Sequence, residues 1–230
     1  MSIRKVISYI CKLTVITAAA AGIIISALAG RSAFMGGSTV FMYFTIQSNI
    51  LIALICAAGW YLIARNIPIS DAWYTIKLVG TVSITLTGTV FVILLAPLLG
   101  SEAWIMQNTL THVVVPLAAV IDFFVVASGV EIPKRRVLYV IIPPLIYAAY
   151  AGIGYVRNWQ FALGNNYPYF FLNWGSPAGA FGFSNELPYM GCVWWILILL
   201  GFLMLIGYLY VFIAGKIHLT SSINNCSTDE

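Results

Sequence analysis

Six long apolar stretches, separated by short polar or basic connections, constrain this chain more than any other feature of its sequence. They cover residues 7–29, 40–64, 73–98, 106–129, 137–156 and 188–214. Most are long enough to cross a hydrocarbon core of about 30 Å as a helix that rises about 1.5 Å per residue. Because a strand or loop exposed to lipid would leave backbone polar groups unpaired, each stretch is expected to be helical. The sequence therefore predicts an all-α, polytopic membrane protein built as a bundle of six transmembrane helices.

The composition excludes an ordinary soluble domain of this size. Of the 230 residues, 61% are hydrophobic and only 8% are charged, whereas soluble domains are about half apolar and a quarter charged. A chain this short cannot bury so much apolar side chain in one core, but surrounding lipid can cover it. The net charge of +4 is small and gives no indication of a nucleic-acid partner. With no internal repeat and no linker, residues 1–230 are predicted to form a single transmembrane domain.

Basic residues are distributed unevenly over the two sides of this predicted bundle. Nine of the eleven fall on alternate connections, namely Arg4, Lys5, Lys12, Arg65, Lys77, Lys134, Arg135, Arg136 and Lys216. The other side carries only Arg31 and Arg157, with Glu102 and Glu186. Because basic residues are retained on the cytoplasmic side, both termini are predicted to be cytoplasmic. The basic N-terminus also resembles a signal peptide, but the apolar run after it is long for one, and we interpret it as the first span.

The connection over residues 157–187 is unusually long and aromatic, and it contains the run NWQFALGNNYPYFFLNWGSPAGAFGF. This composition does not suit a solvated, disordered loop, because Trp and Tyr are favoured at the level of the lipid headgroups. We expect the segment to fold back over the outer mouth of the bundle. Two roles stay open for it, an interfacial anchor and a lid or wall of a pocket.

Small residues and prolines mark how the helices are expected to pack. Small side chains recur at every fourth position of the first stretch, at Ala18, Gly22, Ser26 and Gly30, which lets a neighbouring backbone approach closely. Prolines lie in or at the ends of later helices, at Pro97, Pro116, Pro143 and Pro144. Each removes a backbone hydrogen bond and favours a kink. We interpret both features as structural.

Polar side chains at membrane depth are costly, so they are the first place to look for function. The second stretch opens YFTIQSNI and carries, on or beside one helix face, Thr45, Gln47, Ser48 and Asn49. The fourth opens QNTLTHVVVP, in which Asn108 lies one turn before His112. His112 is the only imidazole predicted at membrane depth, because His218 falls in the predicted tail after the last helix. It is either a base that works near neutral pH or a core histidine bonded to a neighbour such as Asn108.

Depth brings two of these residues to the same level of the membrane. Thr45 lies about five residues into its predicted helix, or ~7 Å, and His112 about six residues, or ~9 Å. Both helices run inward from the outer side, so a contact between the two side chains is possible if the helices are neighbours. Asp122 lies ~15 Å further along the same helix as His112 and on a different face, so it cannot orient that imidazole. A structural partner for Ser, Thr or Tyr, or a proton relay, stays open for Asp122.

No metal or cofactor is expected. None of the four cysteines, Cys11, Cys56, Cys192 and Cys226, lies in a CxxC pair, the spacing typical of zinc and redox sites. Those in apolar runs are expected to act as small hydrophobes.

At YFTIQSNIL and THVVVPL the chain resembles the androgen-induced, ADTRP-like membrane hydrolases, in their bacterial six-helix branch. The resemblance covers most of the chain and includes the GGS…FT opening of the second helix, the histidine followed by VVP, and YPYFFLN near Tyr167–Asn173. It implies hydrolysis of fatty-acid esters of hydroxy fatty acids by a threonine nucleophile and a histidine, here Thr45 and His112. Asn173 departs from the acidic residue usual in the bacterial pattern. The resemblance also implies a bacterial inner membrane, and the predicted topology puts the active site towards its outer side.

The residues suit this chemistry. Neutral His112 can take the proton of the Thr45 hydroxyl and later protonate the leaving alkoxide. The oxyanion needs hydrogen-bond donors, and the candidates are Gln47, Ser48, Asn49, Asn108 or a backbone N–H. The expected partners are a lipid ester and membrane lipids. Two alternatives stay open, a proton-coupled transporter that uses Asp122 and a non-catalytic membrane scaffold.

Overall fold

The structure is a computed structural model that describes residues 3–29, 37–127 and 131–226. Its elements, in chain order, are α1 (Ile3–Leu28), η1 (Gly37–Met42), α2 (Phe44–Ala64), α3 (Asp71–Val90), η2 (Phe91–Leu95), α4 (Ala96–Leu99), η3 (Gly100–Trp104), α5 (Met106–Thr109), η4 (Leu110–Val114), α6 (Val115–Ala127), η5 (Lys134–Ile141), α7 (Ile142–Val156), η6 (Phe170–Leu172) and α8 (Cys192–Cys226). Six helical segments in the described residues are long and apolar enough to span a membrane. The prediction of a six-helix, all-α membrane bundle is therefore confirmed at that level.

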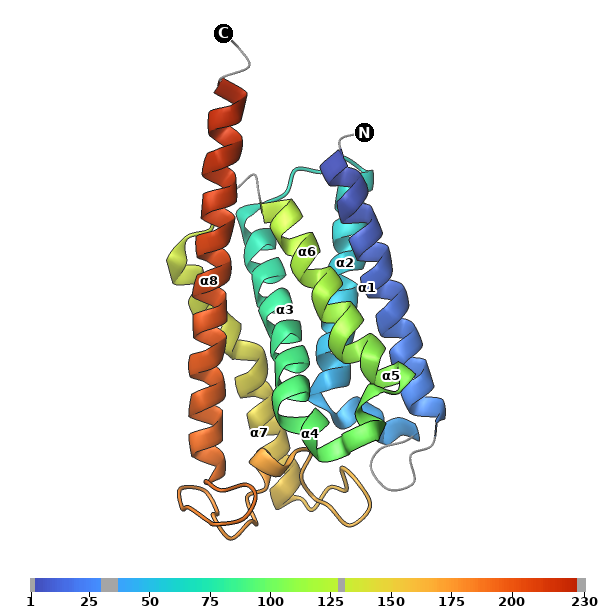
Figure 1. Cartoon of the computed structure of the whole chain (residues 1–230), viewed down its shortest axis with the longest axis vertical. Helices are drawn as coiled ribbons and strands as arrows, with labels where there is room; N and C mark the ends of the chain where they lie inside the picture. Colours follow the sequence, from blue (N-terminus) through green and yellow to red (C-terminus); the bar gives the residue numbers. More distant parts are fainter. Residues whose placement is uncertain (1–2, 30–36, 128–130, 227–230) are drawn as a thin grey trace.

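Four of the six spans form a closely packed group. α1 packs on α2 and on α6, and α3 packs on the other sides of α2 and α6. The last two spans, η5–α7 and α8, lie against the outer face of α3 (Figure 1). Both described ends of the chain lie at one end of the bundle, while the aromatic loop between α7 and α8 lies at the other (Figure 1).

Two spans contain a π-helical turn, and each turn is explained by a proline. The turns are η2 in the third span and η4 in the fourth. Pro97 follows the first and Pro116 the second, and proline has no N–H to bond the carbonyl four residues back. In both spans the residue before the proline instead bonds the carbonyl five residues back, which is the π-helical pattern. Pro116 has no N–H to offer the carbonyl of His112, four residues before it, so this proline shapes the local backbone of a candidate site residue.

Two glycines permit close helix approach beside η4. A Cβ at Gly22 of α1 would lie 2.6 Å from the Thr111 side chain, and one at Gly88 of α3 would lie 2.8 Å from the His112 carbonyl oxygen. Gly22 belongs to the predicted small-residue stripe, in which Ala18 and Ser26 are also buried. Gly30 lies outside the described residues.

A buried ion cluster joins three spans near the end that holds both termini. Asp122 of α6 accepts hydrogen bonds from the Ser8 hydroxyl at 2.7 Å and the Lys12 ammonium at 2.7 Å, and its second oxygen pairs with Lys77. All four residues are buried. The prediction that Lys12 and Lys77 lie in the connections is wrong, because each lies within a helix where the carboxylate compensates its charge. The predicted Ser, Thr or Tyr partner of Asp122 is Ser8, and the two lysines were not anticipated.

Two helix boundaries differ from the prediction in ways that matter below. α2 begins at Phe44, after the 3₁₀ turn η1, so Thr45 lies at the start of the helix and not a turn inside it. α8 continues to Cys226, so His218 lies within this helix and not in a tail. A helix once formed extends by one hydrogen bond per residue, and this extension carries α8 past its apolar segment. The side chains of His218 and Cys226, like Arg31 as a whole, lie outside the described residues.

Candidate active site

Thr45 and His112 meet in the half of the bundle that faces the aromatic loop. Thr45 is the second residue of α2, and His112 lies in the middle of the π-helical turn η4. The Thr45 hydroxyl oxygen lies 3.3 Å from Nε2 of His112. Both side chains are buried, at 6% exposure each. The two spans are neighbours at this level, so the geometric condition for a threonine–histidine pair is met.

The hydrogen bonds on the far side of the ring determine its tautomer. Nδ1 of His112 lies 3.0 Å from the Asn108 carbonyl oxygen, which can only accept, so Nδ1 carries the proton. Nδ1 is also 3.0 Å from the Thr111 hydroxyl, whose own proton goes to the Gln107 carbonyl. A neutral imidazole with its proton on Nδ1 has a lone pair on Nε2. That lone pair faces the Thr45 hydroxyl, which is the arrangement a general base requires.

An aromatic ring covers one face of the imidazole. Phe91 stacks on His112 with ring centroids 3.9 Å apart and an interplanar angle of 18°. Phe91 begins the other π-helical turn, η2, so the two irregular turns contribute the two stacked rings. π-helical turns occur frequently at functional sites. The sequence carries a signal for them in Pro97 and Pro116, for which only a kink was predicted.

The side chains proposed as oxyanion donors from helix α2 have other partners. The Gln47 amide donates to the Phe41 carbonyl. The Ser48 hydroxyl bonds the Thr45 carbonyl and the Thr87 hydroxyl, and the Asn49 amide donates to the carbonyls of Thr45 and Thr111. Ser48 and Asn49 therefore brace the backbone around the pair.

The fourth predicted donor, Asn108, is also occupied. Its side-chain amide donates to the carbonyls of Glu102 and Ala103 in η3, and its backbone carbonyl holds His112 as described. The interpretation of His112 as a histidine bonded to Asn108 therefore holds for the backbone of Asn108. These contacts fix the start of the fourth span on the preceding 3₁₀ turn, so Asn108 orients the His112 imidazole.

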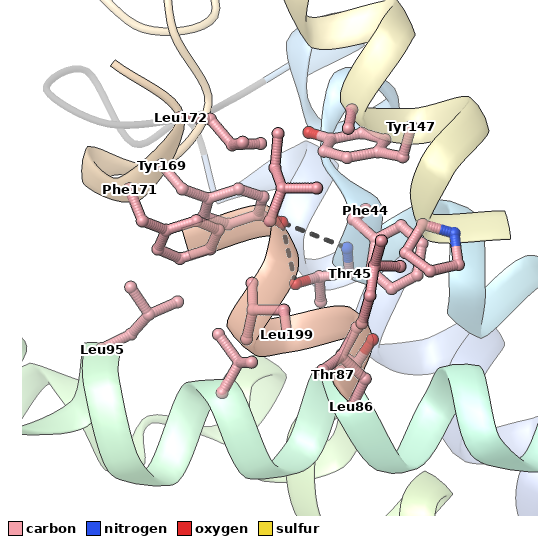
Figure 2. Close-up of a pocket in the computed structure, with 15 residues that line it drawn as sticks. Phe44, Thr45, Leu86, Thr87, Leu95, Tyr147, Tyr169, Phe171, Leu172 and Leu199 are labelled. Atoms are coloured by element: carbon pink, nitrogen blue, oxygen red, sulfur yellow. Dashed lines mark hydrogen bonds between the residues drawn. The ribbon is translucent and has the colours of Figure 1, made fainter. Parts of the chain in front are cut away.

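A residue that the sequence analysis did not select, Tyr169, contacts the threonine directly. Its hydroxyl lies 3.4 Å from the Thr45 hydroxyl oxygen and accepts the Thr45 backbone N–H at 3.3 Å (Figure 2). The N-cap residue of α2, Tyr43, makes no side-chain cap, so Tyr169 supplies the missing acceptor for one of the free N–H groups at the helix start. Burial raises the pKa of the Tyr169 phenol above its ordinary value. The phenol therefore stays protonated and keeps a proton to donate.

Tyr169 comes from the long aromatic loop, which packs deeply against the bundle. Phe161, Phe171 and Leu172 of this loop are buried with it, and the Tyr169 and Phe171 rings are stacked with centroids 5.1 Å apart. Other aromatic residues of the segment, such as Phe183, are exposed. The loop thus forms a wall of the site and also presents aromatic side chains outward.

Two cavities meet at Thr45. The first, called here the lateral slot, has a volume of about 60 Å³ and lies between three helices, with Leu86 and Val90 of α3, Pro144 and Ala148 of α7, and Ile196 and Leu199 of α8 in its walls (Figure 2). The second, called the outer cavity, has a volume of about 250 Å³ and is lined by His112, Phe91, Asn108, Leu98, Asn165 and Tyr167. Thr45, Leu95 and Tyr169 line both cavities. The threonine hydroxyl is therefore at their junction.

Asn173, which departs from the bacterial pattern, lies away from this junction. Its side-chain oxygen accepts the Gly175 backbone N–H at 3.1 Å, so it stabilises a turn of the loop. The matching segment of the resemblance thus contributes Tyr169 to the site, and Asn173 contributes only to loop geometry.

Comparison with known proteins finds no relative of this chain. The sequence matches no protein-family model and no curated protein, and no solved structure matches the fold.

Proposed function

We propose that this chain is an integral membrane hydrolase of lipid carboxylic esters, with Thr45 as nucleophile and His112 as general base. The observation that carries the proposal is the 3.3 Å approach of the Thr45 hydroxyl to Nε2 of an imidazole whose Nδ1 donates to a backbone carbonyl. This is the tautomer and direction that removal of the hydroxyl proton needs. The resemblance to the ADTRP-like hydrolases, which assigns the same two residues, supports it and suggests fatty-acid esters of hydroxy fatty acids as substrates.

The proposed reaction has two steps. In the first, Oγ of Thr45 attacks the ester carbonyl carbon, its proton passes to Nε2 of His112, and the carbonyl electron pair moves onto oxygen. When the tetrahedral intermediate collapses, the bond to the alcohol oxygen breaks and His112 returns the proton to it. In the second step water, deprotonated by the same nitrogen, attacks the carbonyl carbon of the acyl-threonine. The bond from that carbon to Oγ then breaks, His112 returns the proton to Oγ, and the fatty acid and free Thr45 are released.

Charge that develops during these steps has partners among the described residues. The Tyr169 hydroxyl lies 3.4 Å from the Thr45 hydroxyl oxygen, and as a donor beside the reacting atoms it suits the oxyanion. Nδ1 of His112 is held by the Asn108 carbonyl and the Thr111 hydroxyl, two neutral groups. The Phe91 ring stacked on it favours the imidazolium through a cation–π interaction, worth roughly 0.5–2 kcal/mol.

The proposed orientation places both termini in the cytoplasm and the active site towards the outer side of a bacterial inner membrane. Lys12 and Lys77 belong to the ion cluster. Seven other basic residues lie at the start of α1, just after α2, at the start of η5 and in the last part of α8, namely Arg4, Lys5, Arg65, Lys134, Arg135, Arg136 and Lys216. Arg157 lies at the opposite end, just after α7. This distribution still follows the rule that basic residues are retained inside.

Labelling with an alkyl fluorophosphonate tests the nucleophile. The purified protein in detergent is expected to be labelled on Thr45, and the label is expected to disappear in Thr45→Ala. Ester turnover should be abolished in Thr45→Ala and fall by about 10²–10⁴-fold in His112→Ala. Thr89→Ala is the matched control, because the Thr89 hydroxyl bonds only the carbonyl one turn back in its own helix. Labelling that persists in Thr45→Ala would refute the assignment.

The same preparation distinguishes the two alternatives. A proton-coupled transporter would lose uptake into vesicles in Asp122→Asn while Thr45→Ala kept it, and a scaffold would show neither ester turnover nor uptake. Asp122 is held by three partners in the ion cluster and lines neither the lateral slot nor the outer cavity. Nothing in that arrangement favours a transport path over the hydrolase.

A further inference from the structure

The two cavities that meet at Thr45 differ in a way that orients an ester. His112 lines the outer cavity and is not among the residues that wall the lateral slot. Thr45 and Tyr169 line both. The nucleophile and the proposed oxyanion donor are therefore reachable from either side, whereas the proton donor to the leaving group is reachable from the outer cavity alone.

Proton transfer fixes which half of the ester lies on which side. The alcohol oxygen must receive its proton from Nε2 of His112 as the carbon–oxygen bond breaks, so it must lie within hydrogen-bond reach of that nitrogen. The alcohol half then occupies the outer cavity. The carbonyl carbon is at Thr45, so the acyl chain extends the other way, into the lateral slot. Water for the second step can take the position beside His112 that the departed alcohol leaves.

The linings of the cavities agree with this division. The walls of the lateral slot are almost entirely apolar, and the hydroxyl groups among its lining residues are those of Thr45, Thr87, Tyr147 and Tyr169. The outer cavity adds Asn108, Asn165 and Tyr167, which suit an alcohol that carries a polar group. An apolar slot of this kind stays dry and accepts apolar ligands.

The lateral slot also reaches the lipid-facing surface. Pro144 and Ala148 of α7 and Ile196 and Leu199 of α8 are only partly buried. α8 packs most closely on η5, the part of the fifth span that precedes α7, and then on α3 and the outer loop, whereas α7 and α8 make few contacts with each other. An acyl chain can therefore pass between them from the surrounding hydrocarbon without leaving an apolar environment.

We infer that the lateral slot is the acyl-chain site, filled sideways from the bilayer between α7 and α8, and that the outer cavity holds the alcohol half of the ester. The inference rests on the proposed hydrolase function and adds to it the direction of the substrate. It makes Leu199 a residue that determines acyl-chain specificity.

Two ester series test the direction. In the first, one alcohol is kept and the acyl group runs from acetate to palmitate; in the second, hexanoate is kept and the alcohol lengthens. Leu199→Trp fills the lateral slot and is expected to lower the palmitate-to-acetate ratio of kcat/KM by about 10–200-fold, with little effect on the ranking of alcohols. Leu98→Trp, in the outer cavity, is expected to change the ranking of alcohols and spare that of acyl groups. Leu197→Trp is the matched control, because Leu197 is 53% exposed on α8 and borders neither cavity.

Each outcome has a definite meaning. If Leu199→Trp fails to fold, Leu199→Ala replaces it and is expected to raise the preference for bulkier acyl chains. The inference is overturned if Leu199→Trp changes the ranking of alcohols and Leu98→Trp changes the ranking of acyl groups, because the ester would then bind in the reverse direction. It is also overturned if neither variant changes either ranking in a protein that is labelled on Thr45. Absence of turnover and labelling in the unmodified protein would instead refute the proposed function, and the inference with it.

Discussion

The hydroxyl of Tyr169 can be removed almost without altering the packing around it. In Tyr169→Phe the ring keeps its stacking on Phe171 at 5.1 Å and its edge contact with Tyr43 at 5.7 Å. What is lost is two long neutral hydrogen bonds to Thr45, one from its N–H and one with its hydroxyl, together worth about 1–2 kcal/mol of stability. A loss of that size shifts the thermal midpoint by about 2–8 °C in a protein of this length.

The effect on catalysis is expected to be much larger. If the Tyr169 hydroxyl donates to the oxyanion, its removal should cost about 2.7–4 kcal/mol in the transition state, or about 10²–10³ in kcat, with KM nearly unchanged. The assay is steady-state hydrolysis of a palmitate ester by the purified protein, with thermal unfolding followed in parallel. Tyr189→Phe is the control, because Tyr189 belongs to the same loop but is 53% exposed and lines neither cavity.

The pH profile gives a second readout of the same group. A raised phenol pKa means that Tyr169 remains a protonated donor at pH values where a free tyrosine, with a pKa of about 10, begins to ionise. The activity of the unmodified enzyme should therefore not fall near pH 10 through loss of this proton. A kcat within about threefold of the unmodified protein in Tyr169→Phe, a threshold well below the loss expected for one oxyanion donor, would refute its role.

Three further changes test the framework around the site. Asp122→Asn leaves two buried lysines without a counter-charge and is expected to destabilise the protein by about 3–5 kcal/mol. Lys12→Met leaves one lysine paired with Asp122 and should cost far less. Denaturant titration in detergent, followed by tryptophan fluorescence, measures both free energies of unfolding, and equal losses would contradict the charge argument. Gly88→Ala places a methyl group 2.8 Å from the His112 carbonyl oxygen and should cost about 1–3 kcal/mol together with most of kcat; a fully active variant would show that the close approach is not needed. Pro116→Ala restores an N–H opposite the His112 carbonyl, so it is expected to raise the thermal midpoint while lowering kcat. A gain in both would show that activity does not need the π-helical turn.

The membrane architecture follows from hydropathy alone, because lipid forces each apolar stretch to satisfy its own backbone. The position of Thr45 on a buried face with Ser48 and Asn49 also follows from helical spacing, and all three are buried. The helix start was misplaced by four residues, since 3₁₀ turns such as η1 have no distinct apolar pattern. Thr45 nevertheless meets His112. The error in the start of α2 changes the estimated depth of Thr45 only slightly along the membrane normal, so that depth still matches the depth of His112.

The contribution of Tyr169 could not be read from periodicity. It lies in an irregular loop more than a hundred residues after Thr45, and its contact depends on how that loop folds back. The ion cluster was missed for a related reason. Lys12 and Lys77 lie near helix ends, where lysines usually reach the surface, and only the packing of α1, α3 and α6 brings them to Asp122.

Tyr169 bonds both the backbone N–H and the hydroxyl of Thr45. The hydrogen bonding of Thr45 therefore depends on the position of the loop between α7 and α8 that carries Tyr169. Any outward swing of that loop large enough to admit a lipid from the aqueous side would also move the Tyr169 phenol away from Thr45. The proposed enzyme would then be open but inactive. A lipid that enters between α7 and α8 would not disturb the contact of Tyr169 with Thr45, since neither helix supplies Thr45, His112 or Tyr169. The proposed hydrolase can therefore take up a lipid ester from the bilayer while Tyr169 stays in contact with Thr45.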